Sequence, residues 1–437
     1  MKIHFIGIGG IGISGLAQYM QYKGHEVSGS DIKDTLITQK LRSLGIDVTI
    51  PHASSAITDQ DLVVHSAIIR PDNPEIVAAK EKGIEVLARR EALLKILDDR
   101  KVYSVAGAHG KSTTTAILAA IMDGSTIIGA ESKAFGSNVR YDAKSDVMIF
   151  EADESDGSFI NSNPYCAIVI NAEPEHMEYY DYNYERFYDS YRTFINSASC
   201  KVLNAEDPFL ATLINDVEAQ WLYPSKEITN IKYVLINNEP HTRFTLRDLG
   251  SFDVWGFGKH IALDASLAIL AARESMAIEE IRKKLLTFKG IKKRFDIVGL
   301  EKESVIIDDY GHHPTEIKAT FESVKEYAQL KGFDKITAIW QPHKYSRTID
   351  NLDEFIKCFE GAAELIILPV WAAGEAPRDI DFKEKFKSYN LTMADSIKRA
   401  NNTITVIKDK KDLETLDKGL IIGFGAGDIT YQIRGVS

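Results

Sequence analysis

Two short apolar segments of this chain each run directly into glycines and then into a helical pattern. The first segment is Ile3–Ile8, followed by what we call the first glycine loop (residues 7–12, GIGGIG). The second is Lys101–Ala106, followed by the second glycine loop (residues 107–112, GAHGKS). A buried strand that enters a helix through glycines aims backbone N–H groups at one point, where they bind phosphate oxygens. The sequence therefore predicts parallel α/β sheets with two phosphate-binding turns.

The pattern of short apolar runs and helical segments divides the chain into three stretches. With 437 residues the chain is too long for one hydrophobic core. A charged stretch at Asp98–Arg100 and a basic, glycine-bearing stretch at Gly290–Arg294 suit domain borders. We therefore predict three α/β domains, at 1–98, 99–290 and 291–437. The polar–apolar alternation of Thr242–Trp255 predicts a hairpin within the second domain.

The predicted strands share a short length and an apolar centre. They are Ile3–Ile8, Glu26–Ser30, Leu62–Ser66, Glu85–Leu87, Lys101–Ala106, Val147–Glu151, Ala167–Asn171, Val305–Asp308, Ile336–Trp340, Leu365–Val370 and Leu420–Gly423.

Charge and composition narrow the classes of partner. The chain has 52 Lys and Arg against 63 Asp and Glu, a net charge of -11, which argues against nucleic acid as a partner. Its apolar runs fall short of the roughly 18 residues that a membrane span needs. The three cysteines, Cys166, Cys200 and Cys358, are far apart in the sequence and predict reduced thiols. We expect a cytoplasmic protein without nucleic-acid or membrane partners, a monomer or weak homodimer.

The second glycine loop predicts a nucleoside triphosphate site at Gly107, Ala108, His109, Gly110, Lys111, Ser112 and Thr113. Lys111 would reach the β- and γ-phosphates of ATP, and the Ser112 hydroxyl would bind Mg²⁺. The loop is two residues shorter than G-x-x-x-x-G-K-[ST], so an ordinary strand–helix turn is the alternative.

Acidic residues follow two predicted strands of the same domain. The run EADESD at 151–156 follows one strand, and EPEH at 173–176 follows another. Carboxylates at the carboxyl ends of parallel strands can hold the Mg²⁺ that bridges nucleotide phosphates, so the run at 151–156 predicts at least one metal ligand. His176 shares a strand-end position with it and suggests a second metal site. A solvated acidic loop is the alternative reading of either run.

The first glycine loop matches G-x-G-x-x-G through Gly7, Gly9 and Gly12. This pattern alone fits NAD, with Asp31 at the end of the second strand as a ribose ligand. Physically it predicts only that a nucleoside diphosphate is bound at a helix N-terminus. A dehydrogenase has no use for the second glycine loop.

The third domain has two polar clusters after predicted strands. DDYGHHPTE at 308–316 runs from strand-end acids through two histidines into a helix that starts at Pro314. Pro314 and Glu316 are explained as helix-capping residues. QPHKYSR at 341–347 supplies two cations that suit a carboxylate or a developing negative charge, with a surface loop as the alternative.

Taken in order, these segments resemble the Mur ligase family. The resemblance rests on HFIGIGGIGISGLA, GAHGKSTTT, EADESD, AEPEHM, GIKKRFD, DDYGHHPTE, QPHKYSRT and GFGAGDI, which run from residue 4 to residue 429. It implies a Rossmann-like domain for UDP-N-acetylmuramate, a central P-loop ATPase and a Rossmann-like C-terminal domain that closes over the site. It also implies a reaction in peptidoglycan precursor synthesis. ATP and Mg²⁺ would activate the lactyl carboxylate of UDP-N-acetylmuramate as an acyl phosphate, which L-alanine then attacks.

The resemblance also implies roles for single residues. Lys111, His176, Arg294 and Asp309 would be catalytic, and Ser112, Glu151 and His176 would bind Mg²⁺. The UDP-sugar would contact Gly9, Gly10, Ile11, Gly12, Asp31, Ser66 and Arg90. The amino acid would contact Tyr310, His312, Lys344 and Arg347.

Three positions depart from the family pattern. Ser112 stands where Thr is usual and keeps the hydroxyl, and Lys344 stands where Arg is usual and loses the bidentate fork. In the family's G-x-H-N-x-x-N helix start, Ile261 and Asp264 replace the two asparagines that contact adenine.

Four other functions compete with this reading. A ligase that recycles murein tripeptide would share fold and motifs, and free alanine against tripeptide would separate the two. A nucleotide sensor would not need the third-domain clusters, and an NAD-dependent dehydrogenase would have no role for Lys111. A folate polyglutamylation ligase would lack the first glycine loop.

Overall fold

The computed structural model describes residues 1–436, which form two compact units. The first unit consists of Met1–Ile231, Phe244–Val254 and Ala262–Lys289. The second consists of Lys232–Arg243, Trp255–Ile261 and the chain from Gly290 onwards. The three predicted domain ranges stay predictions.

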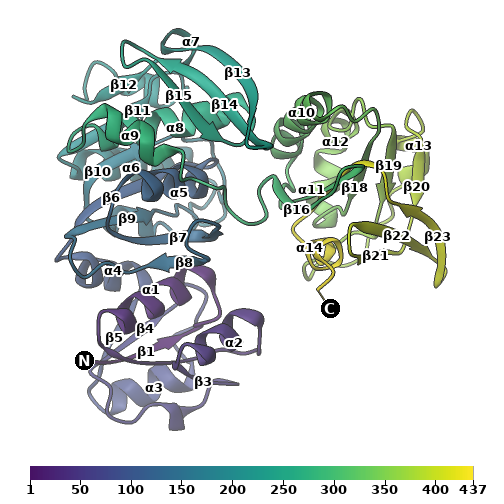
Figure 1. Ribbon diagram of the computed structural model, residues 1–437. Coiled ribbons are helices and arrows are strands. Elements are labelled where there is room, and N and C mark those ends of the chain that lie inside the picture. Colours follow the sequence, from purple (N-terminus) through teal and green to yellow (C-terminus); the bar gives the residue numbers. More distant parts are fainter. Residues whose placement is uncertain (437) are drawn as a thin grey trace. The chain divides into compact units, whose positions relative to one another are not determined.

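A parallel five-stranded sheet of order β3-β2-β1-β4-β5 opens the first unit (Figure 1). Its strands are β1 (Lys2–Ile6), β2 (Glu26–Ser30), β3 (Asp47–Thr49), β4 (Leu62–His65) and β5 (Glu85–Ala88). Its helices are α1 (Ile11–Tyr22), α2 (Leu36–Ser43), η1 (Ser54–Ala56), α3 (Pro74–Glu81) and α4 (Arg89–Leu97).

Helices cover both faces of this sheet because successive side chains of β1 point to opposite sides. Ile3 and Phe5 join the core that contains α1 and α4, whereas Ile6 packs in a separate cluster with Ile76 of α3. The first glycine loop therefore sits between β1 and α1, as predicted, at the carboxyl end of a central strand.

The second sheet of the first unit has the order β12-β11-β10-β6-β9-β7-β8 and is parallel except for β8. Its strands are β6 (Lys101–Ala106), β7 (Ser125–Ser132), β8 (Ser137–Arg140), β9 (Val147–Glu151), β10 (Pro164–Val169), β11 (Cys200–Asn204) and β12 (Gln220–Leu222). Its helices are α5 (Lys111–Ile121), η2 (Ser158–Asn161), α6 (Tyr184–Ser197), η3 (Leu210–Leu213), α8 (Lys259–Ala272) and α9 (Ile278–Leu285).

The two sheets of the first unit share one hydrophobic core. Helix α1 approaches β7 closely: a Cβ on Gly15 would lie 3.0 Å from Ile127 Cγ2. Gln18 of α1 also donates a hydrogen bond to Asn138 of β8 (3.2 Å). Since no side chain intervenes at Gly15, the helix that follows the first glycine loop is fixed on the sheet that carries the second.

A three-stranded sheet contains the predicted hairpin. Its order is β13-β14-β15, after the short helix α7 (Pro224–Glu227). The strands are β13 (Ile228–Ile236), β14 (Glu239–Leu246) and β15 (Ser251–Trp255). A backbone hydrogen bond from Leu246 N–H to Gly250 O (3.1 Å) closes the turn between β14 and β15.

The second unit contains a six-stranded sheet of order β16-β17-β24-β18-β19-β20, in which β16 alone is antiparallel to its neighbour. An antiparallel sheet β21-β22-β23 accompanies it. The strands are β16 (Asp296–Leu300), β17 (Ser304–Asp309), β18 (Ile336–Trp340), β19 (Glu364–Ile367), β20 (Leu391–Met393), β21 (Ser396–Ala400), β22 (Thr403–Lys408), β23 (Lys411–Leu416) and β24 (Gly419–Phe424). The helices are α10 (Pro314–Lys331), α11 (Tyr345–Asp350), α12 (Leu352–Lys357), α13 (Phe382–Lys385) and α14 (Ile429–Arg434).

Among residues 1–436, no helix is both long and apolar enough to cross a bilayer. The cysteines are not all separated in space. Cys166 and Cys200 lie opposite each other on β10 and β11, because the crossover through α6 brings these strands together in register. Cys358 is buried in the second unit.

Candidate active site

The first glycine loop contacts the side chain of Asp31 through Gly9. Gly9 N–H donates a hydrogen bond to Asp31 Oδ2 (2.8 Å), and a Cβ on Gly9 would lie at the same distance from that oxygen. Gly7 has φ 79°, and Ser66 lies beside it, 3.2 Å from the place of a Cβ. Gly10 N–H bonds to Gly7 O, and Ile11 begins α1 with a half-exposed side chain. The structure thus brings together the predicted residues Gly9, Gly10, Ile11, Asp31 and Ser66.

An arginine that the sequence analysis missed covers the start of α1. A Cβ on Gly12 would lie 3.0 to 3.2 Å from the guanidinium atoms of Arg89. The predicted Arg90 has a side chain that is 56% exposed, and its carbonyl accepts a hydrogen bond from Asn161. Because the two arginines are adjacent at the start of α4, sequence alone does not distinguish them.

The second glycine loop lies between β6 and α5, as predicted. Gly110 has φ 84°, and Gly107 leaves room for Asn171, whose carbonyl oxygen would be 3.2 Å from a Cβ there. The Asn171 side chain holds the loop in place, because it exchanges two hydrogen bonds with the backbone of His109, each 3.1 Å long. Thr113 lies in the first turn of α5.

Lys111 is paired with a fully buried carboxylate. Its Nζ lies 2.9 Å from Glu154 Oε2 and also donates to the carbonyl oxygens of Gly107 (2.6 Å) and Ala108 (3.2 Å). Burial alone would lower the pKa of Lys111, but Glu154 and Asp153 together raise it above its ordinary value. The lysine therefore stays cationic at the loop where phosphates would bind.

Ser112 and Glu151 form a second polar pair at this loop. Ser112 Oγ donates to Glu151 Oε1 (2.9 Å), and Gly129 N–H donates to the other carboxylate oxygen (2.6 Å). Burial raises the pKa of Glu151 above its ordinary value. The hydroxyl and the carboxylate are hard oxygen donors of the kind that suits Mg²⁺.

His176 lies in a group with two other possible metal ligands. One ligand atom from each of Glu154, Glu175 and His176 lies within 4.8 Å of the other two. His176 has the left-handed backbone conformation (φ 53°). The residues predicted from the sequence to bind Mg²⁺ together with His176 are Ser112 and Glu151, and Glu154 is not among them. Carboxylate oxygens and an imidazole nitrogen together fit a divalent cation, so both the Ser112–Glu151 pair and this group can hold Mg²⁺.

An ion pair links the neighbourhood of the first glycine loop to the acidic run at 151–156. Arg89, which lies against Gly12, is 3.4 Å from Asp156 of the acidic run. Both side chains are largely buried, at 13% and 16% exposure. A chain of contacts thus leads from the first glycine loop through Arg89 to the acidic run, whose Glu154 pairs with Lys111 of the second glycine loop.

Asp264, where the family pattern has asparagine, packs under the second glycine loop. A Cβ on Gly110 would lie 2.7 Å from Asp264 Oδ1. Burial raises the pKa of Asp264 well above its ordinary value, with Thr114 as the neighbouring polar side chain. A carboxyl group that keeps its proton has one O–H donor and an acceptor oxygen, so it can replace the carbonyl and one of the two N–H donors of an asparagine amide.

A second polar cluster lies in the second unit, around Asp309 at the end of β17. Its carboxylate accepts hydrogen bonds from Phe295 N–H (2.7 Å) and Gly311 N–H (2.8 Å). Burial raises the pKa of Asp309 to about 6, although Arg294 opposes this rise. Arg294 itself is 3.1 Å from Glu316 Oε1 at the start of α10.

The predicted amino-acid ligands continue this cluster. The rings of Tyr310 and His312 are 5.5 Å apart, and those of His312 and His343 are 5.6 Å apart. Arg347 Nη1 lies 3.2 Å from His343 Nδ1. Burial lowers the pKa of His312, and burial and the neighbouring His312 lower that of His343 to about 4. Because both imidazoles are neutral, the guanidinium groups of Arg294 and Arg347 are what make the cluster suited to an anion.

His343 was not among the predicted ligands, although it lies within the predicted polar segment 341–347. Lys344, the residue before α11, has φ 67°, and its N–H bonds to Trp371 O (2.8 Å). The strained backbone at Lys344 fixes where this turn begins.

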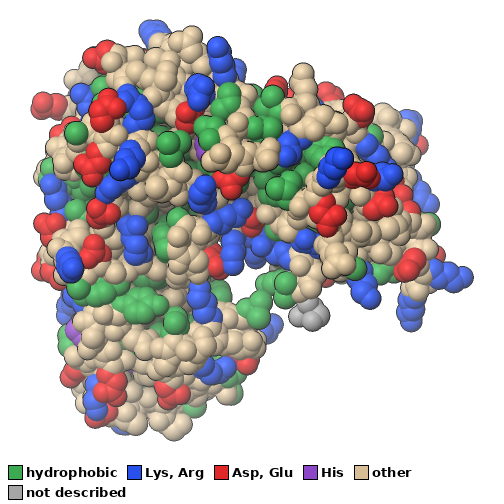
Figure 2. All heavy atoms as spheres, in the orientation of Figure 1, with side chains coloured by type: hydrophobic (Ala, Val, Ile, Leu, Met, Phe, Trp, Pro, Cys, Tyr) green, Lys and Arg blue, Asp and Glu red, His purple; other side chains and the backbone are tan. Residues whose placement is uncertain are grey.

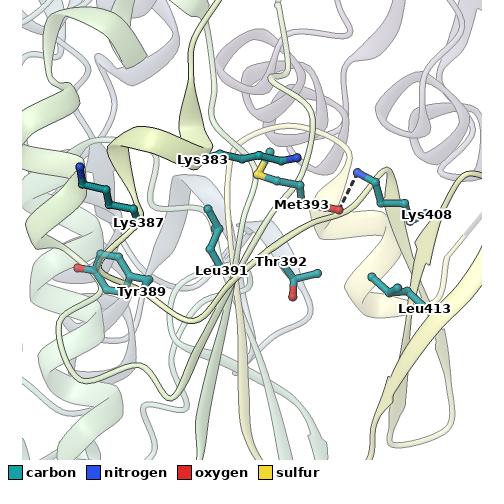
Figure 3. Close-up of a pocket in the computed structure, with 8 residues that line it drawn as sticks. All are labelled: Lys383, Lys387, Tyr389, Leu391, Thr392, Met393, Lys408 and Leu413. Atoms are coloured by element: carbon teal, nitrogen blue, oxygen red, sulfur yellow. Dashed lines mark hydrogen bonds between the residues drawn. The ribbon is translucent and has the colours of Figure 1, made fainter.

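A hollow of about 380 Å³ lies elsewhere in the second unit (Figure 3). Lysine and apolar side chains line it: Lys383, Lys387, Tyr389, Leu391, Thr392, Met393, Lys408 and Leu413. Lys408 Nζ donates to Met393 O (2.9 Å), and none of the predicted site residues contributes to the lining. Acidic and basic side chains are interspersed over the face of the molecule in Figure 2.

Three family models match successive parts of the chain. The model described as Mur ligase family, catalytic domain, matches residues 2–101. The Mur ligase middle domain matches 105–272, and the Mur ligase, glutamate ligase domain matches 293–422.

Known proteins resemble the chain over almost its whole length. A UDP-N-acetylmuramate–L-alanine ligase from Campylobacter curvus is 53% identical over 434 residues, which are 99% of this chain and 99% of the relative. The crystal structure of a UDP-N-acetylmuramate–alanine ligase from Thermotoga maritima has a TM-score of 0.82 and 26% identity, covering 99% and 97% of the two chains. A murein peptide ligase from Psychrobacter arcticus has a TM-score of 0.63 at 19% identity, covering 100% and 99%, and supports the fold alone.

Proposed function

This chain belongs to the Mur ligase family, and we propose that it joins L-alanine to the lactyl carboxylate of UDP-N-acetylmuramate with hydrolysis of ATP to ADP and phosphate. The observation that carries the proposal is the pair of glycine loops in one unit, with Arg89 against the first loop and paired with the acidic run whose Glu154 pairs with Lys111 of the second loop. One loop suits the sugar nucleotide and the other suits the triphosphate. The 53% identity to a ligase of this name supports the same reaction.

Residues 1–98 would bind the sugar nucleotide. Backbone N–H groups of the first glycine loop and the N-terminus of α1 favour its pyrophosphate. Arg89 lies against Gly12 and would add a cation there, in addition to the predicted Arg90. Asp31 already fixes the loop through Gly9 N–H, which supports a structural part for this carboxylate beside a ribose contact.

Residues 99–290 would bind ATP. Lys111 lies at the N-terminus of α5, where its ammonium group can stabilise charge on the β- and γ-phosphates. Ser112, Glu151 and His176 would hold Mg²⁺, which neutralises phosphate charge when it is bound. Glu154 lies close to both Lys111 and His176 and is a further candidate ligand.

Residues 291–437 would bind the amino acid. The guanidinium of Arg347, oriented by His343, suits the carboxylate of alanine. Tyr310, His312 and Lys344 belong to the same polar cluster. Arg294 would stabilise charge on the transferred phosphoryl group, and Asp309 would hold the nearby turn through Phe295 and Gly311.

The reaction then proceeds in two displacements. A lactyl carboxylate oxygen attacks the γ-phosphorus of ATP, ADP leaves, and an acyl phosphate forms. The neutral amine of alanine attacks the acyl carbon, phosphate leaves, and the amine loses a proton as the amide forms. Lys111 and Arg294 would stabilise the charge that develops on the phosphoryl oxygens, which is the main catalytic task in phosphoryl transfer.

The test is phosphate release from ATP, measured with Mg²⁺, UDP-N-acetylmuramate and L-alanine, with each omitted in turn. We expect release that requires every component, with one amide formed for each phosphate. Release with L-alanyl-γ-D-glutamyl-meso-diaminopimelate but not with alanine would replace the proposal by the recycling reaction. No release with either amine would contradict both.

A further inference from the structure

Two thiols of the first unit are in direct contact. Cys166 of β10 and Cys200 of β11 are partners in the parallel register, and their Sγ atoms are 3.0 Å apart. Both are free thiols. This separation is too short for both sulfurs to ligate one metal ion, because metal–sulfur bonds of about 2.3 Å at a tetrahedral angle hold sulfurs farther apart. The geometry suits a bond between the two sulfurs instead.

The two cysteines differ in access and acidity. Cys166 is buried, whereas Cys200 is partly exposed, so an oxidant from water meets Cys200 first. The Cys166 thiol donates its hydrogen bond to the Cys200 sulfur, which lowers the pKa of Cys200 and raises that of Cys166. Lys101 and Lys201 also favour the Cys200 thiolate, while Glu274 opposes it. Cys200 is thus the better nucleophile.

We propose that Cys166 and Cys200 are a peroxide-sensitive dithiol that closes to a disulfide within the chain. The Cys200 thiolate attacks one oxygen of hydrogen peroxide, the O–O bond breaks, and hydroxide leaves with formation of a sulfenic acid. Cys166 sulfur then attacks the Cys200 sulfur, and the hydroxyl leaves as water when it takes up the Cys166 proton. Two thiols and one peroxide give one disulfide and two waters.

The cross-link would join the starts of the two strands and not the site itself. Cys166 pairs with Tyr103 of β6, three residues before the strand ends at Ala106 and the second glycine loop begins. The segment that the disulfide would enclose contains Asn171, His176 and α6. The modification therefore ties the crossover that carries His176 while leaving the loop and its lysine unaltered.

Cys358 provides the internal control. It is buried, its thiol hydrogen bonds to the carbonyl oxygens of Pro314 and Glu354 at 3.3 Å, and burial raises its pKa to about 12. Both its access and its acidity predict that it stays reduced.

The experiment exposes the folded full-length chain to hydrogen peroxide, traps thiols with an alkylating agent and identifies peptides by mass spectrometry. We expect the wild-type chain to lose two hydrogens, to show a peptide linking Cys166 to Cys200, and to recover both thiols with dithiothreitol. In Cys166→Ser, Cys200 has no resolving thiol, so further peroxide should oxidise its sulfenic acid to sulfinic and sulfonic acid, which dithiothreitol does not reduce. In Cys200→Ser, loss of the Cys166 thiol should slow at least about tenfold.

Three results would overturn the proposal. One is that peroxide leaves all three thiols of the wild-type chain reduced, and both remaining thiols of Cys166→Ser as well. Another is oxidation of Cys358 at the same rate as Cys200. The third is a disulfide that forms between chains instead of within one, seen as a dimer in a non-reducing gel. Cys200→Ser only replaces a sulfur by an oxygen at a partly exposed position. Its thermal unfolding should therefore match that of the wild type and show that the variant is folded.

Discussion

Lys111 and Glu154 form an ion pair, so replacing Lys111 affects the stability of the fold as well as turnover. Glu154 is fully buried, and Lys111 is its cation. Lys111→Ala should lower turnover by about 10²–10³-fold and also destabilise the fold by about 3 kcal/mol, because it leaves a buried carboxylate unpaired. Phosphate release and urea unfolding measure the two effects separately.

The double variant Lys111→Ala, Glu154→Gln separates charge from catalysis. A neutral side chain at 154 removes the unpaired charge, so most of the lost stability should return. Turnover should stay low, since the lysine is still missing. Recovery of turnover in the double variant would show that Lys111 acts only by pairing Glu154.

Asp264 should make stability depend on pH in a predictable direction. Burial raises its pKa well above the ordinary value of 3.8, so the folded chain binds this proton more tightly than the unfolded chain. Its contribution to stability is therefore lost as pH rises from 3.8 toward the raised value. Asp264→Asn removes the ionisation and should add about 1 kcal/mol, or roughly 2–4 °C in Tm, at pH 8.

The same substitution should have a smaller effect on Tm at pH 4, because the raised pKa of Asp264 favours its uncharged form in the folded chain at low pH. The exposed Asp216→Asn is the control and should change Tm equally little at both pH values. An equal gain from Asp264→Asn at both pH values would contradict a role for ionisation.

At the scale of elements, apolar runs located many of the inner strands, but β7 and β11 were missed although each lies inside its sheet. β6, β9 and β18 have the predicted bounds, because buried parallel strands are largely apolar. β2 has its predicted bounds too, although Val27 is its only hydrophobic side chain. The short strand β3 and the polar strands β21–β23 were missed, since they lie at edges or in a half-exposed sheet.

The site followed the same division. The positions of both glycine loops could be predicted because the backbone there requires glycine, and Asp31 could be predicted because it directly follows the second strand. Arg89, Asn171 and Glu154 could not, because their positions depend on contacts between distant segments: Gly12 with Arg89, His109 with Asn171, and Lys111 with Glu154.

Glu316, in the first turn of α10, both caps this helix and pairs with a candidate site residue. Glu316 accepts hydrogen bonds from the backbone N–H groups of His312 and His313 and pairs with Arg294. Glu316→Ala should cost about 1 kcal/mol, as loss of a helix cap does. It should also lower kcat, because Arg294 loses its orienting partner.

Glu316→Gln is the matched control for that variant. The amide oxygen can still accept from the backbone, and the lost ion pair is worth about 1 kcal/mol or less because Arg294 is 41% exposed. Thermal unfolding of Glu316→Gln should therefore lie near the wild type and well above Glu316→Ala. Equal losses in both variants would mean that charge, and not capping, is what Glu316 contributes.

At the scale of the whole molecule, the proposed function assigns the sugar nucleotide and the triphosphate to the first unit and alanine to the second. The first unit contains both glycine loops, and the second contains the Arg294–Arg347 cluster. Binding of UDP-N-acetylmuramate alone should therefore depend on Arg89 and be indifferent to Arg347. Apparent affinity for alanine during turnover should show the opposite dependence.

A crossed pair of variants tests this division. Arg89→Lys keeps a charge beside Asp156 but loses the planar fork, and should weaken UDP-N-acetylmuramate binding in calorimetry by about tenfold with KM for alanine unchanged. Arg347→Lys should raise KM for alanine by a similar factor and leave the calorimetric Kd of the sugar nucleotide unchanged. If Arg347→Lys weakened sugar-nucleotide binding in the absence of ATP and alanine, the two units would not be independent in that first step, and the assignment of the sugar nucleotide to the first unit alone would fail.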